Sequence, residues 1–190
     1  KLLEIIFNLN KSGISYYINP LGRRITAEEI LEMGSDASGI IAGLEPYSKK
    51  VLSKLPKLRC ISRVGVGIDN IDQDFAKLKG IEIRNTPNVV IQPVVELTLA
   101  MIFDLLRKTT LHTSLIKSGK WERHVGNLLY GKTVGIIGTG KIGKKLAEVF
   151  TTLGVKVNAY DLYPDKNWSV LNQIRYTSLK TLLKESDIIS

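Results

Sequence analysis

Three glycines stand between an apolar run and a helix-like run, and this pattern limits the fold more than any other feature of the sequence. The segment Val134–Gly143 reads VGIIGTGKIG, and the next apolar run ends at Asp161. A strand, a glycine turn, a helix and a second strand that ends in an acidic residue are typical of a βαβ unit that binds a dinucleotide. We therefore predict an α/β fold with parallel strands around this turn.

Each of the three glycines has a separate task in such a turn. Gly138 allows the strand to turn sharply into the helix, because a side chain would penalise the backbone angles required. Gly140 lets a pyrophosphate approach the main chain, and Gly143 lets the helix pack close to the strand. The N–H groups of Lys141, Ile142 and Gly143 then point at the anion, and the helix dipole and the Lys141 ammonium add attraction. These five residues are the predicted pyrophosphate site.

Asp161 decides between the two nicotinamide cofactors. Its carboxylate can accept hydrogen bonds from the adenosine ribose hydroxyls, and its charge would repel the 2′-phosphate of NADP. We therefore predict NAD as the cofactor. The motif itself recognises pyrophosphate and ribose, so a flavin, another adenosine ligand or a glycine turn without a ligand stays open at this point.

Strand-like and helix-like segments alternate along the whole chain, which favours βαβ units. We predict strands at 14–18, 39–42, 58–64, 81–84, 132–137, 155–160 and 174–176, and helices at 26–34, 48–55, 72–79, 93–118, 141–153 and 179–185. Pro87 breaks regular structure and divides a domain of residues 1–88 from one of residues 89–190. The prediction is two Rossmann- or flavodoxin-like parallel-sheet domains separated by a hinge. Because the chain begins within an apparent helix and stops within an apparent strand, we expect a fragment in which both domains are incomplete.

A second glycine pair follows the strand predicted at 58–64. Gly65 and Gly67 flank Val66 and expose backbone N–H groups that could hold a carboxylate, with the charge of Arg63 nearby. The alternative is a tight strand-to-helix turn capped by an aspartate, Asp69 or Asp72, and the spacing does not separate these interpretations.

Composition excludes several classes of function. The net charge is +9, but the basic residues are spread along the chain rather than gathered on one element, so we expect no nucleic-acid partner. The most apolar window, 94–106, is shorter than the ~20 residues that a membrane span needs. The single cysteine, Cys60, lies in an apolar run, and we interpret it as a small buried strand residue in a reducing, cytoplasmic protein. We expect no metal site.

Six motifs together resemble the D-isomer-specific 2-hydroxyacid dehydrogenases, and within them the D-3-phosphoglycerate dehydrogenase-like branch. They are Arg63–Asp72, Asn85–Asn88, Val95–Thr98, Ser118–Arg123, Gly131–Gly143 and Tyr160–Asp161, in the order and spacing of that family. The resemblance implies hydride transfer between NAD and a 2-hydroxy or 2-oxo acid. The first domain would bind the substrate and the second the cofactor.

The resemblance also implies roles for individual residues. The Gly65-Val66-Gly67 loop would face the substrate carboxylate and the nicotinamide, with Val66 close to the cofactor and Arg63 at the margin of the active site. Trp121 would have a packing role, and the long helix from Pro93 would form a homodimer surface. The catalytic arginine, glutamate and histidine of the family would follow Ser190, so no catalytic residue is assigned here and we expect the 190-residue chain alone to be inactive.

Neither histidine of the chain matches the family's catalytic motif, and we interpret His112 and His124 as surface residues. The branch suggests 3-phosphoglycerate and hence serine biosynthesis as the context of the reaction. However, enzymes of that branch often carry a basic residue where this chain has Ala42-Gly43, so D-lactate, glyoxylate or a related acid stays open. A non-catalytic relative that senses NAD or binds a protein is the alternative from another functional class.

Overall fold

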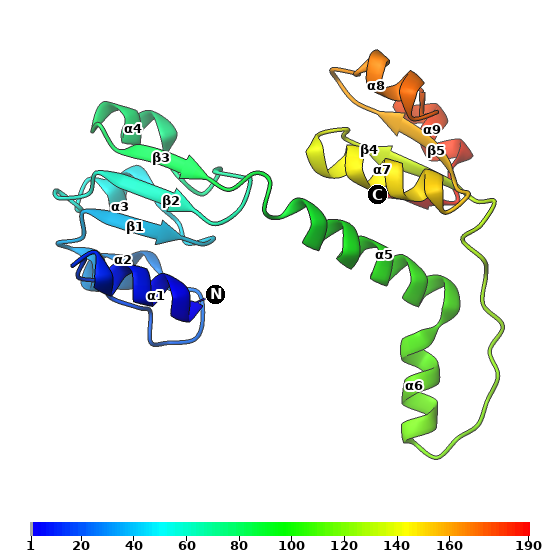
Figure 1. Ribbon diagram of the computed structural model, residues 1–190, viewed down its shortest axis with the longest axis horizontal. Coiled ribbons are helices and arrows are strands. Elements are labelled where there is room, and N and C mark those ends of the chain that lie inside the picture. Colours follow the sequence, from blue (N-terminus) through cyan, green and yellow to red (C-terminus); the bar gives the residue numbers. More distant parts are fainter. Residues whose placement is uncertain (1) are drawn as a thin grey trace. The chain divides into compact units, whose positions relative to one another are not determined.

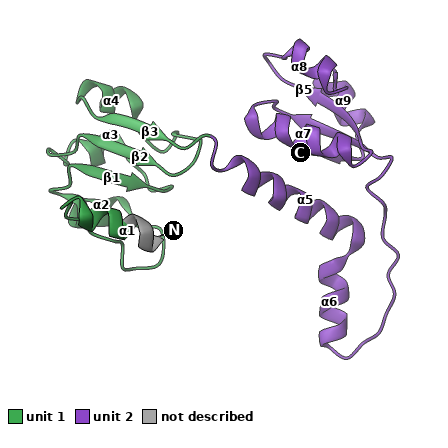
Figure 2. Cartoon of the chain, in the orientation of Figure 1, with its two compact units in different colours: residues 1–87 green, residues 88–190 purple. Residues whose placement is uncertain are grey.

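The computed structural model describes the backbone of residues 2–190 and the side chains of residues 6–190. The chain divides into two compact units, residues 1–87 and 88–190 (Figure 2). Asn88, which the sequence analysis assigned to the first domain, lies in the second unit. The two units are described separately below.

The first unit is built on a parallel sheet of order β1-β2-β3 (Figure 1). Its strands are β1 (Gly39–Ala42), β2 (Cys60–Arg63) and β3 (Glu82–Asn85), and its helices are α1 (Leu2–Lys11), α2 (Ala27–Gly34), α3 (Lys49–Leu52) and α4 (Gln73–Leu78). Ile61 and Ala76 are fully buried in its core, and the Tyr47 ring packs with them. Thr26 and Glu29 form a capping box that starts α2 where the sequence predicts it.

Two predictions for the first unit are wrong. Residues 14–18 form no strand, and Ile14 and Tyr17 are exposed, because this apolar run is not paired with any strand of the sheet. Cys60 is exposed rather than buried. Successive side chains of a strand point to opposite faces, and Ile61 occupies the core face of β2, so Cys60 takes the other face.

The second unit contains a parallel sheet of order β6-β5-β4-β7. Its strands are β4 (Thr133–Ile137), β5 (Lys156–Tyr160), β6 (Arg175–Tyr176) and β7 (Ile188–Ile189), and its helices are α5 (Ile91–Arg107), α6 (Thr109–Lys117), α7 (Lys141–Thr152), α8 (Lys166–Leu171) and α9 (Leu179–Glu185). The chain order of the strands is therefore 3-2-1-4, as in the first part of a Rossmann fold. The order reverses between β4 and β7, which places the start of α7 beside this reversal.

The core of this unit lies between the sheet and its helices. Val134 of β4, Ala159 of β5 and Phe150 of α7 are fully buried, and α5 contributes Val95 and Ile102 to the same cluster. These contacts hold α7 firmly against β4 and β5. The predicted α/β fold with parallel sheets is confirmed.

The long helix predicted at 93–118 is instead two helices. Lys108 adopts a left-handed conformation, with φ at 57°, and separates α5 from α6. The Asp104 carboxylate accepts hydrogen bonds from the Thr109 hydroxyl and from the hydroxyl and N–H of Thr110. It thereby caps the start of α6. Helix α8 was not predicted, and its N-cap is Asp165, whose carboxylate accepts from the N–H of Trp168.

Candidate functional site

The glycine turn after β4 has the geometry that its sequence requires. Gly138 has φ at 95°, a value that side chains rarely allow, and its N–H donates to the Tyr160 carbonyl at 2.8 Å. A Cβ placed on Gly143 would lie 2.0 Å from the Gly138 carbonyl oxygen, so only glycine permits this approach of helix and strand. A Cβ on Gly140 would meet no atom within 4 Å. The space in front of Gly140 is therefore open to a ligand.

The start of α7 presents backbone donors at that space. Lys141, Ile142 and Gly143 form its first turn, and N–H groups in a first turn have no acceptor within their own helix. The N-cap is Gly140, which has no side chain to bond them. The Lys141 ammonium donates to the Asn88 side-chain oxygen at 2.7 Å. An anion at this helix start would thus meet three amides and a lysine anchored nearby.

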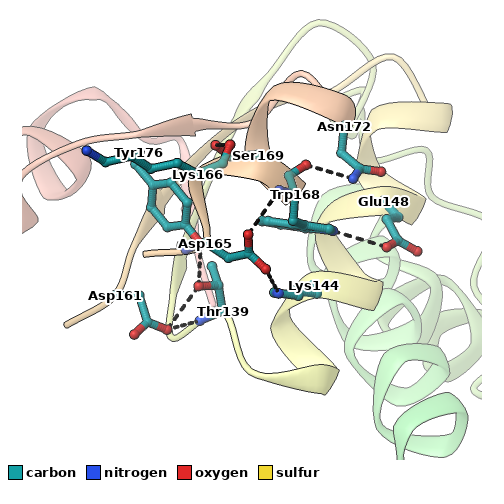
Figure 3. Close-up of polar contacts among 10 residues, drawn as sticks. All are labelled: Thr139, Lys144, Glu148, Asp161, Asp165, Lys166, Trp168, Ser169, Asn172 and Tyr176. Atoms are coloured by element: carbon teal, nitrogen blue, oxygen red, sulfur yellow. Dashed lines mark hydrogen bonds and ion pairs between the residues drawn. The ribbon is translucent and has the colours of Figure 1, made fainter. Parts of the chain in front are cut away.

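Asp161 follows β5 and is held by three hydrogen bonds, of which Figure 3 shows the two from Thr139. One carboxylate oxygen accepts from the N–H of Thr139 at 2.6 Å and from its hydroxyl at 2.9 Å, and the other accepts from the N–H of Tyr163 at 2.9 Å. These bonds lower the pKa of Asp161 below its usual value, and the bond from the Tyr163 N–H has the largest effect. The side chain is therefore a charged acceptor of fixed orientation at neutral pH.

Thr139, which is not among the predicted site residues, is the main hydrogen-bond partner of Asp161. It is 5% exposed, and its hydroxyl also lies 2.6 Å from the Tyr176 hydroxyl at the end of β6. The sequence carries only a weak signal for this arrangement, because the middle position of a G-x-G turn accepts many residue types. The partner of Thr139 is known only once β5 and β6 are placed.

In the first unit, the loop after β2 is fixed to the end of β3. The Gly65 N–H donates to the Thr86 hydroxyl at 2.8 Å, and the Asn85 amide donates to the Val66 carbonyl at 2.7 Å. Val66 and Gly67 are exposed, and in the described part of the chain their N–H groups have no hydrogen-bond acceptor. The loop therefore offers two free amides at the carboxyl edge of the sheet.

Arg63 lies against this loop. Its guanidinium donates to the Val64 carbonyl, and a Cβ on Gly65 would lie 2.5 Å from Arg63 Cζ. The guanidinium is the flexible end of a side chain and could move aside, but Gly65 also has φ at 142°, a backbone conformation that other residues rarely adopt. The capping alternative holds for Asp72, whose carboxylate accepts from the Phe75 N–H at 3.0 Å and starts α4. Capping and anion binding are compatible here, because Asp72 lies beyond the loop.

The structure thus gathers the predicted site residues into two groups. Arg63, Gly65, Val66 and Gly67 lie together in the first unit, and the residues of the glycine turn lie with Asp161 in the second. The contact predicted between Val66 and the cofactor would join the two units and stays a prediction.

The remaining polar candidates lie elsewhere. His112 and His124 are half-buried rather than fully exposed, their ring centroids are 5.8 Å apart, and the His112 Nε2 lies 3.2 Å from the His124 carbonyl. Trp121, predicted to pack, is 89% exposed. Among the described residues, no group of His, Cys, Asp and Glu could hold a metal ion, and no helix is long and apolar enough to cross a membrane.

Comparison with known proteins identifies the family. Residues 99–190 match the NAD binding domain of the D-isomer specific 2-hydroxyacid dehydrogenases. A hydroxypyruvate reductase of Thermotoga maritima is 42% identical over 135 residues, which are 70% of this chain and 43% of that protein. The chain belongs to the D-isomer specific 2-hydroxyacid dehydrogenase family. The family assignment and the prediction of NAD as cofactor are confirmed.

Other members of the family show how far the likeness extends. A D-3-phosphoglycerate dehydrogenase of Pongo abelii is 36% identical, over 81% of this chain and 32% of that protein. The solved D-lactate dehydrogenase of Aquifex aeolicus, complexed with NAD and lactic acid, is 30% identical with a TM-score of 0.80. The match covers 98% of this chain and 56% of that structure. The chain thus spans between a third and about half of the length of these relatives.

Proposed function

We propose that the protein transfers a hydride between NAD and a D-2-hydroxy acid, with the second unit holding the cofactor and the first unit holding the acid. The observation that carries the proposal is the fit of the glycine turn to a dinucleotide. Gly140 leaves open space, and the first turn of α7 directs its N–H groups at that space. The Asp161 carboxylate can accept hydrogen bonds from the ribose hydroxyls. Bound NAD supplies the hydride chemistry, and the chain binds and orients it.

The loop after β2 supports the substrate part of the proposal. A 2-hydroxy acid carries a carboxylate, and the free amides of Val66 and Gly67 beside the Arg63 guanidinium suit a small anion. The alternative from another functional class, a protein that senses NAD without turnover, would use the second unit alone. It gives no reason for these free amides.

The surroundings of Gly43 favour an acid without a phosphate group. The Gly43 N–H donates to the Glu45 carboxylate at 2.7 Å, and the Asn70 amide donates to the Gly43 and Glu45 carbonyls. A carboxylate therefore lies beside the position at which enzymes of the phosphoglycerate branch often carry a basic residue, and its charge would repel a phosphate. We propose hydroxypyruvate, glyoxylate or pyruvate as the oxo acid, ahead of the phosphorylated acid of serine biosynthesis.

Binding measurements with the 190-residue chain test this proposal. The chain is saturated with NADH and titrated with hydroxypyruvate, glyoxylate, pyruvate and 3-phosphohydroxypyruvate by calorimetry. We expect at least one unphosphorylated acid to bind more tightly than the phosphorylated one. Arg63→Gln should weaken that binding at least about tenfold, since a hydrogen bond to a charged group contributes about 1.5–3 kcal/mol. Arg175→Gln is the control. It removes an exposed arginine of the second unit that pairs with Glu185 of the same unit, and it should leave the affinity for the acid unchanged.

Two outcomes would contradict the proposal in different ways. If NADH binds and none of the four acids does, the chain is an NAD-binding protein without a site for an oxo acid, as the sensing alternative requires. If 3-phosphohydroxypyruvate binds most tightly, the enzyme class stands and the argument from Glu45 is wrong. If the Glu45 carboxylate does disfavour a phosphate group, Glu45→Gln should strengthen binding of the phosphorylated acid.

We also propose that the protein acts as a cytoplasmic homodimer. Support comes from apolar side chains along α5 that are not covered in this unit, including Leu97, Met101 and Leu105, the last 79% exposed. An apolar surface of this kind is typical of a protein interface. Sedimentation should detect a dimer, and Leu105→Glu should convert it into a monomer.

A further inference from the structure

A line of hydroxyl groups ends at the Asp161 carboxylate (Figure 3). The Thr139 hydroxyl lies 2.9 Å from the carboxylate and 2.6 Å from the Tyr176 hydroxyl. The Asp165 N–H in turn donates to the Tyr176 oxygen at 3.3 Å. The line runs from the segment before α8, across the end of β6, to the glycine turn.

The direction of every hydrogen bond in this line is determined by its last member. An ionised carboxylate has no hydrogen to donate, so the Thr139 hydroxyl must donate to Asp161. A hydroxyl has one hydrogen, so the Thr139 oxygen can only accept from the Tyr176 hydroxyl. The Tyr176 oxygen then accepts from the Asp165 amide, as observed. All three donors point toward Asp161.

The line is built into the packed part of the unit. Thr139 is buried, and Tyr176 packs against the core and meets the Trp168 ring edge-on, with 6.4 Å between ring centroids. Of the two Asp161 oxygens, Oδ2 accepts both bonds from Thr139, whereas Oδ1 accepts one, from Tyr163. Oδ1 therefore retains more capacity to accept a hydrogen bond from a ligand.

We propose that Thr139 and Tyr176 are positioning residues that hold the Asp161 carboxylate toward the adenosine ribose and so set the preference for NAD over NADP. The proposal rests on the binding of NAD by the second unit. Without the Thr139 hydroxyl, the carboxylate keeps the N–H bonds from Thr139 and Tyr163, but Oδ2 loses one of its two donors and is held less firmly. It can then rotate away from the ribose, where it would no longer repel a 2′-phosphate.

The test is the ratio of the dissociation constants for NADP and NAD, measured by calorimetry on the 190-residue chain. We expect Thr139→Val to lower this ratio about tenfold, because it removes the hydroxyl but keeps the shape and the N–H. Tyr176→Phe should lower it less, about threefold, because Thr139 can still donate. Thr139→Ser keeps the hydroxyl and should restore the ratio.

Two controls separate positioning from a general loss of structure. Thr151→Val removes a hydroxyl that donates only to the Ala147 carbonyl within α7, and should leave the ratio unchanged. In an Asp161→Ala background, Thr139→Val should have no further effect on the ratio, because the hydroxyl acts through the carboxylate. Thermal melts of each variant show whether it is folded, and Tyr176→Phe carries the test if Thr139→Val does not fold.

The proposal is overturned if folded Thr139→Val keeps the wild-type ratio, or if it lowers the ratio equally with and without Asp161. Failure of NAD binding itself would look different, because the wild-type chain would then bind neither cofactor. If both Thr139→Val and Tyr176→Phe keep the wild-type preference for NAD, the positioning role is refuted, whereas the proposal that the second unit binds NAD still stands.

Discussion

Replacing Gly143 by alanine should both destabilise the second unit and weaken its binding of NAD. The new Cβ would lie 2.0 Å from the Gly138 carbonyl oxygen and 3.1 Å from its carbon. An ordinary carbon–oxygen contact is about 3.3 Å, so α7 and the glycine turn must separate by about 1 Å. No rotamer relieves the contact, because a Cβ is fixed by its backbone and its neighbour here is backbone.

The effect on stability follows from two opposing terms. Overpacking in a rigid region costs about 1–3 kcal/mol, and alanine returns up to about 1 kcal/mol of helix propensity. We expect a net loss of about 1–2 kcal/mol in the free energy of unfolding. A displacement of ~1 Å would also break one or two amide bonds to a phosphate, each contributing about 1.5–3 kcal/mol. The dissociation constant for NAD should therefore rise at least tenfold.

Gly140→Ala is the matched control, since it adds the same methyl group where no atom lies within 4 Å. Gly140 has φ at −66° and ψ at −171°, which alanine adopts without strain. Its free energy of unfolding should change by less than about 0.5 kcal/mol, while the methyl group occupies the phosphate space and weakens NAD binding. Urea denaturation followed by circular dichroism, together with calorimetric titration, measures both quantities. A Gly143→Ala variant as stable as wild type, or a Gly140→Ala variant with unchanged affinity, would refute the reasoning.

Two further predictions concern stability. Lys108→Gly should raise the free energy of unfolding by up to about 1 kcal/mol, because it relieves the left-handed conformation at φ 57°; a lower urea midpoint would contradict this. Acid should destabilise the chain. The Arg23 hydrogen bond and other contacts lower the pKa of Glu29 from 4.5 to about 2, so its stabilising effect is complete above pH 4.5 and is lost as the pH falls toward 2. Stability should therefore decline over this range, and Glu29→Gln should make the decline less steep; an equal slope in the variant would count against the Glu29 contribution.

The features that the sequence predicts well depend on neighbours along the chain. The glycine turn is one, because Gly138 and Gly143 satisfy requirements set within a few residues. The capping box at Thr26 and the cap at Asp72 are others, since each side chain bonds a backbone group three residues later. Local rules of this kind do not require knowledge of the fold.

The predictions that fail, and the residues that were missed, depend on partners distant in the sequence. Exposure of Cys60 follows from which face of β2 the core uses, and the apolar run at 14–18 has no strand beside it. Thr139 and Tyr176 are far apart in sequence, and they meet only because β6 pairs with β5 and β5 pairs with β4. The break at Lys108 is different, because its signal is local. Thr109 and Thr110 follow the break and bind Asp104, but the apolar periodicity that continues from 93 to 118 concealed it.

The chain contains two G-x-G loops after strands, and their middle residues have opposite roles. Val66 is 41% exposed and presents a free amide, whereas Thr139 is buried and donates to a carboxylate. The spacing of the glycines is the same, so spacing cannot explain the difference. The neighbouring parallel strand does: β3 ends in Asn85, whose amide binds the carbonyl of the middle residue, and β5 leads into Asp161, whose carboxylate binds its amide. Each loop is thus fixed by the end of the adjacent strand, and the chemistry of that end determines which backbone groups stay available for a ligand.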